Sequence, residues 1–198
     1  MLSFATAVFL LIITPGPGVL SAAGVGAAHG FTRGTRYVAG LFLGTNLVAL
    51  AVISGLAAVV FTIPGLRQVL ALLSVSYLMY LAYRIATAGA KVGFSAAEDA
   101  PGIRAGLLLQ FINPKAYAVN TALFTGFPFY PDSLVVETIA KLIIVNAIWI
   151  PIHLVWLQAG VVLHRLDLPE RTHRRINVAM AMALVGVVLL ALVSSVRA

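Results

Sequence analysis

The sequence predicts an all-α integral membrane protein with six transmembrane helices. We expect two inverted three-helix repeats, in which helices one and four are broken. The chain is 61% hydrophobic and only 10% charged, with a mean hydropathy of +1.04, whereas about a quarter of the residues of soluble domains are charged. Long uncharged segments and two proline-containing breaks half a chain apart complete the pattern.

The transmembrane segments follow from charge-free stretches of the chain. A spanning helix needs about 20 predominantly apolar residues. Residues 1–32, 37–66, 142–164 and 176–196 contain no Asp, Glu, Lys or Arg, and residues 66–88 and 104–127 carry charges near their ends or at Lys115. The N-terminus lacks the basic region of a signal peptide and its apolar run is long, so we expect this segment to be retained as the first span.

The basic residues indicate orientation rather than nucleic-acid binding. The formal charge is +7, but the Lys and Arg residues fall in short segments between spans. Nine flank the segments after spans one, three and five: Arg33, Arg36, Arg84, Lys91, Arg104, Arg165, Arg171, Arg174 and Arg175. Only Arg67, Lys141 and Arg197 lie on the other side. Because the cytoplasmic segments of membrane proteins carry an excess of Lys and Arg, both termini are predicted to be periplasmic.

Residues 89–103 form the expected cytoplasmic linker between repeats at 1–88 and 104–198. This stretch mixes small residues, charges and a proline. Three spans is an odd number, so a second copy of the first half enters the membrane upside down. Two spacings fit such a repeat: Pro15 and Pro114 are 99 positions apart, and Asn46 and Asn146 are 100 apart.

The two breaks are the predicted substrate-binding site. Proline removes a backbone donor within each helix, and the freed polar groups must line a protected cavity in lipid. The residues of the first break are Thr14, Pro15, Gly16, Pro17 and Gly18, with the helix resuming near Val19. Those of the second are Asn113, Pro114 and Lys115, with Asn113 as a helix cap. Helix N-termini attract anions, so we expect a carboxylate site; the alternative is a pair of ordinary proline kinks.

Lys115 is the residue for which the sequence makes the most specific prediction. A charged residue inside a span is costly and is expected to face the bundle interior or a wet cavity. In the alternative, the span starts later and the side chain reaches the membrane surface.

Other polar residues extend this site. Asn46 and Asn146 are further substrate-binding candidates. Like Gln110 and Gln158, they could hold the ammonium of a zwitterion or bind helices together. His153 is the proton-coupling candidate, since histidine titrates near neutral pH; it could equally bond a neighbouring carbonyl. No Asp or Glu lies deep in a span, so the expected substrate is zwitterionic or anionic.

The paired motifs Thr14–Pro17 and Asn113–Ala116 resemble those of the lysine exporter family, particularly its homoserine and threonine efflux branch. The likeness covers the whole chain and includes Gly40, Gly44 and Gly55 and the tyrosine-rich run at 77–83. It implies an inner-membrane exporter of amino acids or their derivatives, driven by protons and compatible with a homodimer. The family often has Asn or Asp where this chain has Gly18.

The remaining alternatives are a passive small-solute channel, an intramembrane enzyme or an accessory membrane subunit. An enzyme is disfavoured because Ser21 has no evident base and the four histidines have no helical ligand spacing. We therefore expect no catalytic residues, no metal and no cofactor. The lipid bilayer and a small-molecule substrate are the expected partners, and nucleic acid is not.

Overall fold

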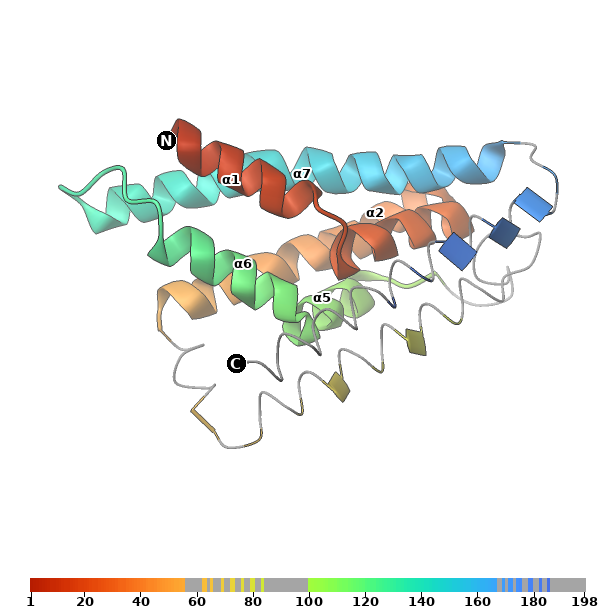
Figure 1. The fold of residues 1–198 in the computed structure, drawn as a ribbon, viewed down its shortest axis with the longest axis horizontal. Helices are drawn as coiled ribbons and strands as arrows, with labels where there is room; N and C mark the ends of the chain where they lie inside the picture. The colour runs from red at the N-terminus through yellow and green to blue at the C-terminus, as the bar shows by residue number, and fades with distance from the viewer. Residues whose placement is uncertain are drawn as a thin grey trace.

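The computed structural model describes residues 1–55 and 100–166, together with single positions between 62 and 83 and between 169 and 185 (Figure 1). All the described elements are helices: α1 (Leu2–Ile13), α2 (Pro17–Ile53), α5 (Ile103–Ile112), α6 (Pro114–Thr125) and α7 (Leu134–Arg165). Most of the predicted third and sixth spans, most of the linker 89–103 and Tyr77 lie outside the described residues.

Two of these helices, α2 and residues Leu134–Leu163 of α7, are long and apolar enough to cross a membrane by length and composition. The other described helices are short because both predicted breaks are present. The chain leaves helical geometry between α1 and α2 and again at Asn113 between α5 and α6. The second segment resumes at Pro17, two residues earlier than expected, because proline is well suited to the first position of a helix.

Helix α2 contains a sharp change of direction at Gly30. This residue has φ 76° and ψ 176°, a conformation that L side chains rarely adopt. Gly26 and Gly34, on either side of it, both meet Leu157 of α7. The half of α2 before Gly30 therefore belongs to the first predicted span, and the half after it belongs to the second. Figure 1 shows the chain turning back between the two halves.

Glycines bring the helix backbones together. A Cβ atom at Gly26 would meet the Leu157 carbonyl, and one at Gly160 of α7 would meet the carbonyl of Ala23. The same reciprocal contact joins α2 to α5, where Gly40 faces Ile103 and Gly106 faces Tyr37. Small residues allow this close approach in membrane bundles. These glycines thus serve packing within one chain, and the homodimer stays a prediction.

The core lies between α1, α2 and α7. Phe4, Val8 and Ile12 recur every fourth residue, so they form one buried face of α1. This face packs in the same cluster as Val145 and Trp149 of α7. It fixes α1, and hence the first break, against the middle of α7.

One expectation about Lys141 needs correction. The sequence count treats it as a charge flanking an outer segment, but it lies inside α7, 3% exposed, with its Nζ 2.9 Å from Glu137 Oε1. Glu137 Oε2 also accepts the N–H groups of Phe129 and Tyr130, and Lys141 donates to the Gly126 carbonyl. This buried ion pair ties the segment after α6 to α7. A Glu to Lys spacing of four on a helix is the signal that sequence reasoning overlooked.

Candidate substrate site between two broken helices

The first break leaves the N-terminus of α2 without a side-chain cap. Gly16 is the residue before the helix and makes no side-chain bond, Pro17 has no N–H, and the first N–H bonded along the helix is that of Leu20, to Gly16 O at 3.0 Å. The N–H groups of Gly18 and Val19 precede this bond and have no carbonyl partner within the helix. This end of α2 therefore offers two backbone donors and a partial positive charge.

The second break satisfies its own backbone, as the sequence predicts. Asn113 Oδ1 accepts the Lys115 N–H at 3.1 Å, and the Asn113 carbonyl accepts the Ala116 N–H at 3.0 Å. Asn113 Nδ2 donates in turn to Gln110 Oε1 at 2.9 Å. The N-terminus of α6 is consequently capped, and its contribution to a site is the side chain of Lys115.

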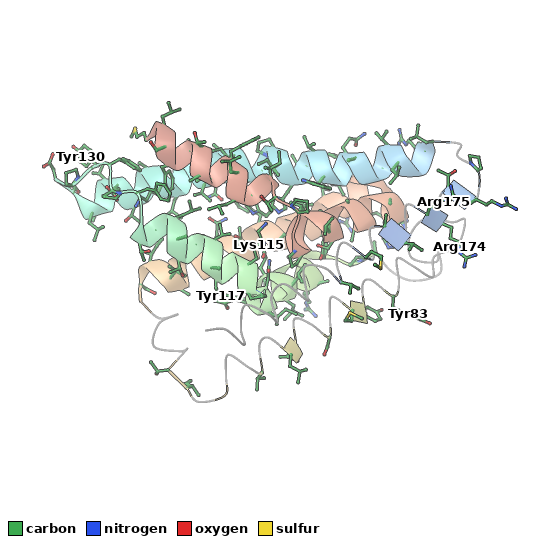
Figure 2. The ribbon with its side chains drawn as sticks, viewed as in Figure 1. Tyr83, Lys115, Tyr117, Tyr130, Arg174 and Arg175 are labelled. Carbon is green, nitrogen blue, oxygen red and sulfur yellow. The ribbon has the colours of Figure 1, made fainter. Side chains whose placement is uncertain are left out.

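Lys115 joins the two breaks. Its Nζ donates to the Thr14 carbonyl at 2.6 Å, across 101 positions of sequence. Its side chain crosses Gly16 so closely that a Cβ there would lie 2.8 Å from Lys115 Cδ. Figure 2 shows Lys115 near the middle of the long axis, away from the ends marked by Tyr130 and Arg175. Lys115 thus lies away from both labelled ends, as expected for a side chain that faces the bundle interior.

A cavity opens where the breaks meet, with about 510 Å³ of empty space including the part that opens to the surroundings. Every described helix contributes lining residues. The polar residues of the wall are Thr14, Thr45, Gln110, Asn113, Lys115, Asn120 and His153, and Gly16 and Gly18 supply exposed backbone.

His153 projects from α7 into this cavity. Its Nδ1 lies 3.0 Å from the Trp149 carbonyl oxygen, and since a carbonyl oxygen only accepts, Nδ1 is the donor. The ring stacks on Trp149 with centroids 3.5 Å apart and an interplanar angle of 14°. The carbonyl bond anticipated as the alternative role for His153 is thus present. The opposite ring nitrogen, Nε2, lies beside Gly18, where a Cβ would be 3.2 Å from it.

The predicted site residues divide into three groups. Thr14, Gly16, Gly18, Asn113, Lys115 and His153 line the cavity together. Pro15, Pro17 and Pro114 are not among the lining residues and act through the backbone, by interrupting the helices.

Asn46 and Asn146 form the third group, which the cavity wall does not include. They bond each other reciprocally, Nδ2 to Oδ1, at 3.1 and 2.9 Å, so the helix-holding alternative accounts for their contacts. Their chain neighbours Thr45 and Val145 line the wall instead.

Sequence reasoning overlooked Thr45 and Asn120 and favoured a structural role for Gln110 over contact with a substrate ammonium. Each is a polar residue within a predicted span, and this was the signal available in the sequence. The sequence does not show which face of each span turns inward. Within the described part of the chain, no group of three His, Cys, Asp or Glu residues could hold a metal ion.

Two interrupted helices that meet at a polar cavity inside an apolar bundle define a membrane translocator. Residues 9–195 match the LysE type translocator family, and the chain belongs to that family. The protein is therefore a multi-pass membrane translocator and not an enzyme, as the sequence predicts.

Among individual relatives, the chain is similar to the leucine efflux protein of Klebsiella pneumoniae, with 29% identity over 131 residues that cover 64% of this chain and 62% of that protein. It is also similar to the cysteine/O-acetylserine efflux protein of Escherichia coli K12, with 28% identity over 185 residues and 92% of both chains covered. The corresponding Salmonella typhimurium protein is 27% identical over 184 residues, again 92% of both chains. No solved structure matches the chain.

Proposed function

We propose that this protein exports neutral amino acids or their derivatives from the bacterial cytoplasm across the inner membrane, in exchange for protons. The relatives named above are leucine and cysteine/O-acetylserine efflux proteins, which supports an amino-acid cargo. The substrate site in this proposal is the cavity between the two breaks. Residues of both breaks line it, together with residues of α5, α6 and α7.

One observation carries the proposal: the Lys115 ammonium of the second break lies at the uncapped N-terminus created by the first. It bonds the Thr14 carbonyl, two residues before Gly16, which precedes α2. A substrate carboxylate placed there would accept the Gly18 and Val19 N–H groups and would draw the ammonium away from a neutral carbonyl. Charge-assisted bonds of this kind are about twice as strong as neutral ones.

The charge of the lining residues sets the substrate class. Among the described residues of the wall, Lys115 and His153 are the titratable side chains, and none is Asp or Glu. A purely cationic substrate would meet a positive charge without a counter-ion. The site therefore favours a zwitterion or an anion, which agrees with the neutral cargo named for the relatives.

The inverted repeat belongs to the same proposal. Asn46 and Asn146, at equivalent positions of the two halves, exchange identical hydrogen bonds, as two residues on a twofold axis do. The Lys115 bond to Thr14 likewise brings the equivalent breaks together. These contacts support repeats at 1–88 and 104–198, with six spans in total.

We propose periplasmic termini on the charge asymmetry. With Lys141 neutralised by Glu137, the outer side retains Arg67 and Arg197 against nine basic residues on the other side. Reporter fusions at Ala198 and within residues 89–102 test this orientation. A cytoplasmic C-terminus would contradict it.

The function is tested in inverted membrane vesicles from a strain without its own amino-acid exporters. We expect the vesicles to accumulate leucine or O-acetylserine from a panel of amino acids, and an imposed proton gradient of the physiological direction to stimulate uptake. A passive channel would equilibrate the same solutes at a rate that ignores the gradient. Vesicles that move no member of the panel would overturn the proposed function.

A further inference from the structure

The strongest unexplained group in the cavity is the Nε2 atom of His153. The residue is 3% exposed, and its described contacts are the Nδ1 bond to Trp149 and the stack on the Trp149 ring. Neither occupies Nε2, which lies beside Gly18 in the cavity wall. An acceptor that lines a cavity and has no partner among the described contacts is available to bond a ligand there.

The chemistry of that ligand follows from the tautomer. Because Nδ1 donates its hydrogen to the Trp149 carbonyl, the neutral ring carries a lone pair at Nε2 and presents an acceptor. Asn120 offers a second acceptor in the same wall: its Nδ2 donates to the Ala116 carbonyl at 2.8 Å, and its oxygen has no such bond among the described contacts. Acceptors without a negative charge suit a primary ammonium group beside a carboxylate.

Gly18 provides the space for this group. A Cβ at position 18 would lie 3.2 Å from His153 Nε2 and 3.8 Å from Gln110 Nε2. Contacts of 3.0–3.4 Å to a Cβ are tighter than most, and the Trp149 stack and Nδ1 bond hold the ring from the other side. The absence of a side chain at 18 therefore keeps the Nε2 lone pair open to the cavity.

We propose that His153 Nε2 is the ammonium subsite of the transported amino acid and that a proton competes with the substrate for the same lone pair. This inference rests on the proposed function. When Nε2 is unprotonated it accepts a hydrogen bond from the substrate ammonium. When it takes a proton from water on the periplasmic side it becomes a donor and a cation, and it loses the acceptor.

The competition explains how export and proton entry are coupled. Among the described lining residues, the charged group in the wall with Nε2 is the Lys115 ammonium on α6, while α1, α2 and α5 contribute neutral groups; the substrate adds its own charges. An imidazolium beside two ammonium groups is electrostatically unfavourable. Substrate and proton therefore exclude each other, and release of the proton to the cytoplasm restores the substrate site. Mutual exclusion at one atom is the minimum requirement for exchange.

The test uses the purified full chain in proteoliposomes. Radiolabelled L-leucine and O-acetyl-L-serine are the probes, and each is paired with its analogue without the amino group, 4-methylpentanoate and 3-acetoxypropanoate. Two readouts are taken: the preference for the amino acid in counterflow at equal pH, and the stimulation of transport by a pH gradient. Wild-type protein is expected to prefer the amino acid by roughly tenfold or more, as for loss of a hydrogen bond to a charged group.

His153→Ala removes the acceptor and should reduce that preference to a fewfold. His153→Gln supplies a neutral oxygen that does not titrate, so it should retain more of the preference than His153→Ala while losing the stimulation by a pH gradient. Val155→Ala is the matched control, because Val155 is on the same helix and 65% exposed. It should behave as wild type in both readouts.

The outcomes separate the two proposals. Unchanged preference in His153→Ala would overturn the ammonium subsite, and full gradient stimulation in His153→Gln would overturn the competition. A purely structural histidine would lower both rates without changing either ratio, which also overturns the inference. Wild-type vesicles that exchange neither probe would instead overturn the proposed function.

Discussion

At the first break, between α1 and α2, no side chain caps the helix that resumes, whereas at the second break Asn113 caps α6 with its own oxygen. The first break therefore keeps two backbone N–H groups and exposes the Thr14 carbonyl. The second consumes its backbone donors and contributes a cation, Lys115, that reaches over to the first.

The two breaks, whose prolines Pro15 and Pro114 are 99 positions apart, therefore contribute different chemical groups. The first break supplies backbone N–H and carbonyl groups, which its glycines leave accessible. The second break supplies the ammonium group of Lys115. Neither break is sufficient alone. A helix N-terminus attracts anions only at short range, and Lys115 would lose its bond to the Thr14 carbonyl without the first break. The site exists because the halves meet.

The largest effect is expected when the positive charge of the second break is removed. Lys115→Ala should reduce export by roughly a hundredfold or more, as expected when one member of a buried charged interaction is removed. The measurement is substrate uptake into inverted vesicles per molecule of protein, which corresponds to export from the cell. Protein abundance is followed by immunoblot. Abundance should change little, since the substitution removes a residue that is costly to insert.

Lys115→Arg serves as the geometric control for that variant. The guanidinium keeps the charge but is planar and larger, so a site that holds the ammonium over Gly16 should transport poorly with it. Normal export by Lys115→Ala would refute the role assigned to this lysine.

Gly16→Ala tests the same contact from the other break. The added Cβ would lie 2.8 Å from Lys115 Cδ, so the lysine side chain must move and its bond to Thr14 is lost. We expect apparent substrate affinity to fall by about tenfold, a change of about 1.4 kcal/mol. Gly102→Ala is the control, because its Cβ meets nothing within 4 Å. If both variants keep wild-type affinity, the crossing over Gly16 is irrelevant to binding.

Asn113→Ala should affect stability more simply. It removes the cap from the Lys115 N–H, and loss of such a cap costs about 1 kcal/mol. The melting temperature in detergent should fall by about 2–4 °C. Asn113→Asp retains the acceptor and should recover part of the loss. No difference between the two variants would show that the cap contributes nothing at this break.

The smallest effect concerns the symmetry of the halves. A double-mutant cycle on Asn46→Ala and Asn146→Ala should give a coupling of about 0.6 kcal/mol, the average for polar contacts between membrane helices. The measurement is equilibrium unfolding in detergent. Additive effects would mean that the reciprocal bond does not form, and would remove the main support for a twofold axis between the repeats.

The sequence by itself determined what depends on local backbone chemistry. Prolines 15, 17 and 114 lack the N–H that a helix needs, so both interruptions could be placed. Asn113 before proline is a local capping signal, and its bond to the Lys115 N–H follows from that position alone. Charge-free stretches likewise gave the membrane class, because the cost of burying charge depends on residue type and hardly on fold.

The tertiary structure decided which groups meet. Thr14 and Lys115 are 101 positions apart and meet in a bundle whose helices approach closely at glycines: Gly40 and Gly106 between α2 and α5, and Gly26 and Gly160 between α2 and α7. The same contacts turn His153 Nε2 toward Gly18, leave Asn46 and Asn146 bonded to each other, and bury the Glu137–Lys141 pair. Such rotations of one helix against another depend on the shape of both surfaces together, and a single stretch of sequence specifies only one of them.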